Sequence, residues 1–153
     1  MCLQKLNLPT YEYKLKQEGK KTKIFDAIRR KYFDLTPEEW VRQNLVNYLI
    51  NEKKYPKGLM ALEKGLLINE LSKRTDVLVY SKSAQPILLV ECKAPSVKIN
   101  QAAFDQIARY NIHYKLPYLI VSNGLTHYFA KINFKTNNFI FLKDIPFYNE
   151  LDV

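Results

Sequence analysis

The pattern of apolar and polar positions along the chain predicts two helices separated by strands. From Thr36 to about Glu52, apolar residues recur at helical spacing, so this helix is expected to bury one face. The segment opens T-P-E-E, in which Thr36 is the expected N-cap, proline suits the first turn and Glu39 completes a capping box. A second helix is predicted over residues 100–114.

Short apolar runs bounded by proline, glycine and asparagine predict the strands. They cover residues 59–68, 75–80, 86–93, 118–122, 126–133 and 138–142, with a candidate edge strand at 24–33. The run P-I-L-L-V-E-C-K is nearly continuous in apolar residues, as expected for a central strand covered on both faces. Asn123-Gly124 predicts a tight turn. The order of elements predicts an α/β fold with a mixed β-sheet flanked by helices.

Length and composition favour one domain with its own core, since the chain has 153 residues, of which 47% are hydrophobic. No apolar run approaches the roughly 20 residues that cross a bilayer, and no secretory signal is visible, so a cytoplasmic protein without membrane contact is expected. Cys2 and Cys92 indicate neither a disulfide framework nor a ligand cluster. Several aromatic residues are predicted to lie in the core rather than to form a base-stacking platform, namely Phe104, Tyr118, Phe129, Phe139 and Phe141.

Positive charge is concentrated near the N-terminus. The net charge is +9, and the first 31 residues contain nine basic and only three acidic residues. Residues 1–23 are therefore interpreted as a basic N-terminal extension and residues 24–153 as the folded domain. A polyanionic partner would explain this charge, because each neutralised phosphate releases condensed counterions. An ordinary basic surface is the alternative.

The pattern that suggests chemistry is Asp76 followed by Glu91 and Lys93. The tripeptide E-x-K occurs four times, but only Glu91–Lys93 ends a strongly apolar strand. Side chains two apart in a strand share a face, so Glu91 and Lys93 point together and Cys92 points away. Asp76 begins the neighbouring strand. Two carboxylates beside a lysine suit Mg²⁺-dependent phosphodiester hydrolysis, whereas a buried salt-bridge cluster or solvated strand-end charges are the alternatives.

These residues resemble a known superfamily. Asp76 with the Glu91-Cys92-Lys93 segment is similar to the PD-(D/E)xK nucleases, with Thr75 in place of their proline. Gln106 and Tyr110, four residues apart, resemble the Q-x-x-x-Y element of the RecB-like branch.

A closer resemblance covers about residues 24–146. The chain looks like the N-terminal nuclease domain of type I restriction enzyme R subunits, and most like its small free-standing bacterial form. The segments that carry this likeness are TPEEWVRQ, RTDVLVY, PILLVECKAP, FDQIARYN and LIVSNGLTHY. The resemblance implies a restriction-endonuclease-like fold, although the sequence contains no helicase motor or specificity module.

The resemblance also implies roles for individual residues. Asp76 and Glu91 would be metal ligands, with the Cys92 backbone carbonyl as a third candidate, and Lys93 would be the catalytic lysine. The glutamine and tyrosine of the next helix would support Lys93 or the phosphate, unless they form an ordinary contact on the helix surface.

A glutamate of the first helix is implied as a further metal ligand. Glu39 has a structural role in the capping box, whereas Glu38 is expected on the buried face, where a carboxylate needs a partner, so Glu38 is preferred. Arg42, one turn later, would contact phosphate or pair with Glu38. Arg29 and Arg30 are further candidates for nucleic-acid contact.

The expected function is that of a metal-dependent endonuclease that cleaves DNA rather than RNA, with Mg²⁺ as cofactor and Mn²⁺ as its substitute. DNA and either a second copy of the chain or other restriction-system subunits are the expected partners. A non-catalytic nucleic-acid-binding or accessory module with the same fold is the main alternative. A purely structural protein with a buried salt-bridge cluster is the third reading.

Overall fold

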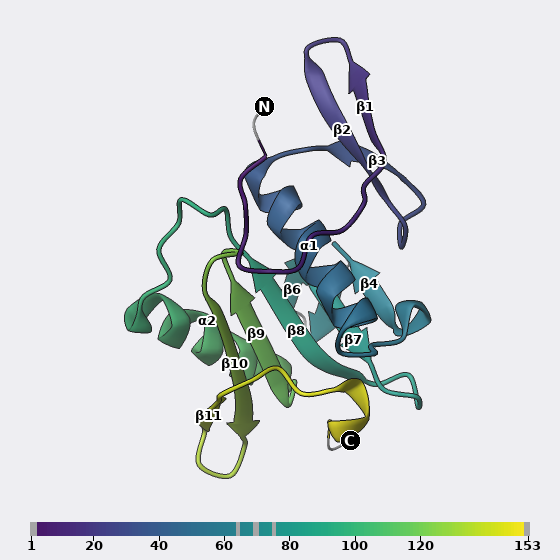
Figure 1. The fold of residues 1–153 in the computed structure, drawn as a ribbon. Helices are drawn as coiled ribbons and strands as arrows, with labels where there is room; N and C mark the ends of the chain where they lie inside the picture. The colour runs from purple at the N-terminus through teal and green to yellow at the C-terminus, as the bar shows by residue number, and fades with distance from the viewer. Residues whose placement is uncertain (1–2, 64, 69–70, 75, 152–153) are drawn as a thin grey trace.

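A six-stranded mixed sheet lies between two helices. The computed structural model describes residues 3–63, 65–68, 71–74 and 76–151, with backbone only at 65–68, 71–74, 110 and 113. The strand order is β11-β10-β9-β8-β7-β4, with α1 on one face and α2 on the other (Figure 1). The bounds are α1 (Pro37–Asn51), α2 (Gln101–Tyr114), β4 (Met60–Leu62), β7 (Val77–Tyr80), β8 (Pro86–Cys92), β9 (Tyr118–Ser122), β10 (His127–Asn133) and β11 (Asn138–Leu142). The predicted mixed sheet flanked by helices is confirmed.

Strand β8 is the centre of this sheet. It runs antiparallel to β7 and parallel to β9, and the parallel pair needs a crossover, which α2 supplies. Strands β9, β10 and β11 pair antiparallel. Every residue of β8 after Pro86 is buried, as the nearly continuous apolar sequence predicted.

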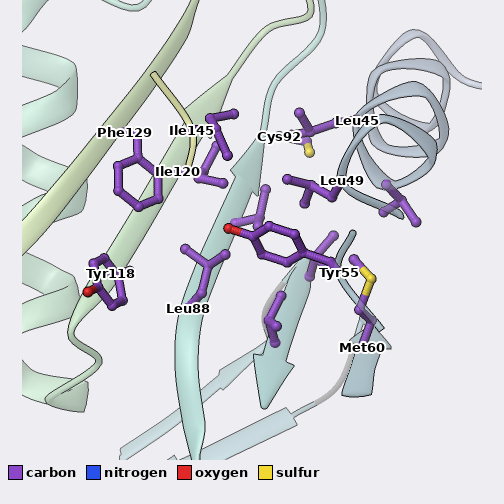
Figure 2. Packing of buried hydrophobic residues seen from close by; sticks show 14 of the residues in the cluster. Leu45, Leu49, Tyr55, Met60, Leu88, Cys92, Tyr118, Ile120, Phe129 and Ile145 are labelled. Atoms are coloured by element: carbon purple, nitrogen blue, oxygen red, sulfur yellow. The ribbon is translucent and has the colours of Figure 1, made fainter. Parts of the chain in front are cut away.

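Alternate residues of β8 belong to two hydrophobic cores on opposite faces of the sheet. Leu88 and Cys92 pack in the core beneath α1, which also contains Leu45. Figure 2 shows this core, in which Leu45 of α1 and Cys92 of β8 come together. Leu89 packs in the second core, with Phe104 of α2. The strand is therefore held between both helices, which fixes the position of its last residues.

Each helix begins at a side-chain cap, of which the sequence predicted the one at Thr36. Thr36 Oγ1 accepts a hydrogen bond from the Glu39 N–H at 3.1 Å, and Asn100 Oδ1 accepts one from the Ala103 N–H at 2.8 Å. Helix α2 ends at Tyr114, and its C-cap Lys115 has a left-handed backbone with φ 54°. Within the described residues, no helix is long and apolar enough to span a bilayer.

A second, three-stranded sheet stands beside α1 (Figure 1). This meander contains β1 (Leu15–Glu18), β2 (Lys21–Asp26) and β3 (Lys31–Asp34). The prediction of one strand over 24–33 is therefore wrong. The reason is that Asp26 Oδ1 accepts hydrogen bonds from the N–H groups of residues 28 and 29, which closes a turn. The boundary expected after residue 23 falls inside β2.

The predicted strand 59–68 is also divided. A short 3₁₀ turn over Lys57–Leu59 precedes β4, and Glu63, with φ 50°, follows it. The remainder forms β5 (Gly65–Ile68), which pairs with β6 (Leu71–Arg74) in a separate two-stranded sheet. The expected strand at 75–80 begins at a residue outside the described ones, and β7 starts two residues later.

The aromatic core is mostly as predicted. Phe104, Tyr118 and Phe129 are buried, and Phe139 is partly buried against the second core. Phe141 is 42% exposed, so its predicted core position is wrong. The Phe141 ring contacts the Phe104 ring, with centroids 4.7 Å apart. Phe141 nevertheless stays partly exposed because its strand, β11, lies at the edge of the sheet and has a neighbouring strand on one side only. A second 3₁₀ turn, Tyr148–Glu150, follows near the C-terminus.

The N-terminal segment crosses α1 and reaches the turn between β9 and β10. Trp40 Nε1 donates to the Gln4 carbonyl at 2.8 Å, and the Asn7 N–H donates to the Gly124 carbonyl at 2.8 Å. Leu6 is buried in the core beneath α1. These contacts pack residues 4–7 against the domain, although their composition predicted a loosely packed extension.

Gly124 lies where this segment meets the turn, and we expect Gly124→Ala to lower the free energy of unfolding by about 2–3 kcal/mol. Gly124 has φ +83°, and a Cβ there would lie 2.7 Å from Leu6 Cδ2. Gly19→Ala should lower the free energy of unfolding by only about 1 kcal/mol, the cost of placing alanine in a left-handed backbone conformation. Gly19 has φ +60°, but nothing lies within 4 Å of a Cβ at this position. Gly58→Ala has neither problem and serves as control. Urea unfolding measures all three, and equal losses at Gly19 and Gly124 would contradict the close packing against Leu6.

Candidate functional site

The predicted convergence of Asp76 with the Glu91–Lys93 segment is observed. Strands β7 and β8 are antiparallel and pair Val77 with Val90, so the residue before β7 lies beside the end of β8. Asp76 Oδ2 accepts a hydrogen bond from the Cys92 N–H at 2.7 Å. The Lys93 N–H donates to the carbonyl of the last residue of β9 at 2.9 Å, which anchors the end of β8 on its other side. The backbone itself therefore brings these residues together.

The middle residue of the E-C-K segment points into the protein, as predicted. Cys92 is buried in the core beneath α1, where burial and then the charge of Asp76 raise the pKa of its thiol. The neutral thiol therefore packs as a small apolar group, which leaves only the backbone carbonyl of Cys92 as a candidate ligand. Glu91 is buried, and its charge, like those of Asp76 and Glu38, raises the pKa of Cys92. All three carboxylates thus lie near the end of β8.

The expected positions of Glu38 and Glu39 are reversed. The Glu39 side chain is 6% exposed and the Glu38 side chain is 44% exposed, so the prediction that Glu38 lies on the buried face is wrong. The physical reason is that Glu39 accepts hydrogen bonds from Arg29, Arg42 and Gln43, which close over it. Its carboxylate therefore forms no capping box, and the Thr36 N–H donates instead to the carbonyl of residue 34.

Glu38 nevertheless faces the candidate site. Partial burial and then the charge of Asp76 raise the pKa of Glu38, while Arg42 and Lys93 act in the opposite direction. These effects show that its carboxylate lies near both Asp76 and Lys93. Glu38 therefore stays a candidate metal ligand because it lies near Asp76. The burial that the sequence suggested for it is not the reason.

Arg42 is buried and connects the first helix to the start of β7. Its guanidinium lies 3.1 Å from Asp76 Oδ1 and 3.4 Å from Glu38 Oε1, and it also pairs with Glu39. Burial lowers the pKa of Arg42, but Glu39 and then Asp76 more than offset this, so the pKa is raised. Of the two roles predicted for Arg42, the structure shows the carboxylate pairing.

Arg29 and Arg30 occupy different environments. The Arg29 side chain reaches from the β2–β3 turn to Asp26 at 2.8 Å and to Glu39, and its guanidinium lies 3.3 Å from the centroid of the Phe33 ring. Arg29 is therefore engaged within the protein. Arg30 is exposed in the same turn with φ 55° and is accessible to a partner.

A cleft of about 640 Å³ opens between the meander and the beginning of α1. Its lining includes Lys23, Tyr32, Asp34, Glu38, Glu39, Arg42, Glu63 and Ala94. Glu38 and Arg42 connect the cleft to Asp76, and Ala94 follows Lys93 in the chain. The cleft thus borders the candidate site through Glu38 and Arg42.

The second helix carries the predicted pair Gln106 and Tyr110. Gln106 is exposed on α2, which packs through Phe104 and Ala108, while the Tyr110 side chain is outside the described ones. Within the described part of the chain, no group of three or more His, Cys, Asp or Glu side chains is arranged to hold a metal ion.

Sequence reasoning did not identify the buried network that joins Asp26, Arg29, Glu39 and Arg42. Gln43 completes it, because its side-chain amide donates to Asp26 at 2.8 Å and to Glu39 at 2.9 Å. The available signal was the spacing of charges, since Asp26–Arg29 and Glu39–Arg42 are each three residues apart.

We expect Arg42→Ala to lower the free energy of unfolding by about 3–5 kcal/mol, because it leaves buried carboxylates without their counter-charge. Arg30→Ala is the matched control, since Arg30 is exposed, and its effect should stay within about 0.5 kcal/mol. Chemical denaturation monitored by circular dichroism measures both. Similar losses in the two variants would show that the Arg42 network does not stabilise the fold.

The stability difference between the wild type and Asp26→Asn should depend on pH. Burial alone would raise the pKa of Asp26, but hydrogen bonds from Arg29 and Gln43 outweigh it and hold the pKa below its usual range. The stabilisation is therefore complete above the ordinary aspartate pKa near 4 and is lost as pH falls through the lower folded value. Unfolding experiments at pH 7, 5 and 3 should show that the difference in free energy of unfolding between the wild type and Asp26→Asn becomes smaller as the pH falls. Asp144→Asn, at an exposed position, is the control, and a gap that widens at pH 3 would contradict the assignment.

The geometry can be set beside known proteins. The family model described as type I restriction enzyme R protein N terminus (HSDR_N) matches residues 37–146. No curated protein matches the chain. A solved fragment described as an HsdR subunit of a type I restriction enzyme from Vibrio vulnificus YJ016 has a similar fold, with a TM-score of 0.52 and 19% identity. The match covers 76% of this chain but only 24% of that one. Because the family model spans most of its length, the chain belongs to the family of type I restriction enzyme R protein N-terminal domains.

Proposed function

We propose that this chain hydrolyses DNA phosphodiester bonds with a divalent metal ion, as a nuclease of the PD-(D/E)xK type. The observation that carries the proposal is the 2.7 Å hydrogen bond from the Cys92 N–H to Asp76, which brings the aspartate to the E-x-K segment. Membership of a restriction enzyme family supports DNA rather than RNA as substrate. The neighbouring cleft offers a path for the phosphate backbone.

The donor groups at the site suit Mg²⁺, with Mn²⁺ as its substitute. Mg²⁺ prefers oxygen ligands and commonly uses one or two carboxylates, completing its shell with water and substrate phosphate. Asp76 with Glu91 or Glu38, together with the Cys92 carbonyl, would hold it. When bound, the ion would activate water and offset the charge that develops on the phosphate.

The protein side chains would then divide the remaining work. Lys93 would share the face of Glu91, two residues before it, and would orient the attacking water or stabilise the developing negative charge. Arg42 would position Asp76, because its guanidinium lies 3.1 Å from Asp76 Oδ1. The partly exposed Glu38 would contact the ion or its water shell from the cleft side.

The HsdR fragment of known structure is much longer, since this chain spans 24% of it. A domain of this size has little surface with which to read a long DNA sequence. We therefore expect target recognition to come from other restriction-system subunits or from a second copy of the chain.

A second candidate function is a DNA-binding accessory module without catalysis. Both carboxylate oxygens of Asp76 are already engaged, one by Arg42 and the other by the Cys92 N–H. In addition, the described residues lack a three-residue metal-binding group. A module of this kind would use the same cleft for DNA and retain the charged cluster for stability.

Metal binding and cleavage together distinguish the two functions. Asp76→Asn and Lys93→Met should each lower the rate of Mg²⁺-dependent cleavage of supercoiled DNA by at least about 100-fold, because each removes a group that acts on the reacting phosphate. Calorimetry with Mg²⁺ or Mn²⁺ should show weaker binding in Asp76→Asn and Glu91→Gln. Circular dichroism confirms that each variant is folded.

The chain supplies its own control in another E-x-K tripeptide. Glu52→Gln and Lys54→Met change the same residue types at an exposed helix end and should leave cleavage unchanged. Wild-type cleavage by both Asp76→Asn and Lys93→Met would refute the proposed active site. DNA binding by the wild type without metal binding or cleavage would favour the accessory module.

A further inference from the structure

The meander presents lysine and aromatic side chains on one face. The strand register pairs Lys16 with Lys23 and Phe25 with Tyr32, so these four residues lie on the same side of the sheet. Ile24 points to the opposite side, where it is fully buried. The lysine face, defined as Lys14, Lys16, Lys23, Phe25 and Tyr32, therefore turns away from the core.

Two aromatic rings order the lysines of this face. Lys16 Nζ lies 4.3 Å from the centroid of the Tyr32 ring, and Lys14 Nζ lies 5.7 Å from that of Phe25. The two rings contact each other with centroids 5.2 Å apart, which fixes them as a pair. A free lysine loses about 1.5–2 kcal/mol of side-chain entropy when it is immobilised. The rings reduce that cost for any anion that these lysines bind.

The counter-charges on this face are weak competitors. Lys23 lies 3.2 Å from Asp34 and 3.9 Å from Glu18, and Lys16 lies 3.5 Å from Glu18. Exposed ion pairs of this kind contribute at most about 1 kcal/mol each and weaken in salt. A phosphate backbone carries one charge per nucleotide and can therefore replace these carboxylates as the partner of the lysines.

The lysine face is continuous with the candidate active site. Lys23 and Tyr32 belong to this face and also line the cleft that contains Glu38. A strand of DNA held by the lysines would therefore extend into the cleft and toward Asp76. Neither the family model, which begins at residue 37, nor the predicted roles of the arginines assign this surface.

We propose that the lysine face binds the phosphate backbone of DNA and directs it into the cleft. This inference rests on the proposed function for the identity of the bound polymer. It assigns the first contact with substrate to a surface that lies outside the metal-binding residues. The aromatic pair acts through the lysines, which it holds in place.

The test compares two double variants that each remove two positive charges. Lys14→Ala/Lys16→Ala changes the lysine face, while Lys135→Ala/Lys143→Ala changes exposed lysines near β11. Binding of a short fluorescent DNA duplex is measured by anisotropy in EDTA over a range of salt concentrations. At 0.1 M salt, each lost lysine should weaken DNA binding by the first variant about tenfold. The slope of log K against log salt concentration should become shallower by about 0.9 for each phosphate contact that is lost. The control variant should match the wild type.

The outcomes separate this inference from the nuclease assignment. Equal binding by the wild type and the lysine-face variant would overturn the inference, as would equal weakening in both double variants or no DNA binding by the wild type. The active site is tested separately by the cleavage rate of Asp76→Asn, because Asp76 lies outside the lysine face. If Asp76→Asn cleaves like the wild type while the lysine-face variant binds weakly, the active site is wrong and the DNA surface is supported.

Discussion

The buried pairing of two arginines with carboxylates determines how the other parts of the site are placed. Arg29 joins the meander to α1 through Asp26 and Glu39, and Arg42 joins α1 to the start of β7 through Glu39 and Asp76. Removing an ion from water costs several kcal/mol, so each guanidinium must keep its partners when it is buried. This requirement holds three elements of the chain in one relative position, which apolar packing alone does not specify.

The same pairing has a chemical consequence at the candidate active site. Repulsion between Glu38 and Asp76 would oppose their approach, and the guanidinium of Arg42 lies between 3.1 and 3.4 Å from both. Arg42 therefore offsets the repulsion between the two carboxylates and lets them lie close together, as two ligands of one divalent cation must. Arg42 thus contributes both to the stability of the fold and to the geometry of the site, and a substitution of Arg42 should affect both.

Local signals predicted most of the fold, whereas contacts between distant segments decided the rest. The cap at Thr36 and the apolar run of β8 depend on neighbouring residues, and both were found in the sequence. The choice between Glu38 and Glu39 failed because helical periodicity assumes that only apolar residues mark the buried face. Glu39 is buried by Arg29, a residue of the preceding meander, and no local pattern reports that contact. The approach of Asp76 to the E-x-K segment was predicted because strand pairing alone produces it.

The network also explains why the meander is part of the site rather than an independent extension. Asp26 closes the β2–β3 turn, because its Oδ1 accepts hydrogen bonds from two backbone N–H groups. Its Oδ2 accepts a hydrogen bond from the guanidinium of Arg29, which also donates to Glu39. The turn that orients the meander is thus fixed by the same charges that lead to Arg42 and Asp76. A surface that gathers DNA is useful to a nuclease only if it has a defined position relative to the reacting phosphate. In this chain that position is set by four successive ion pairs, which are Asp26–Arg29, Arg29–Glu39, Glu39–Arg42 and Arg42–Asp76.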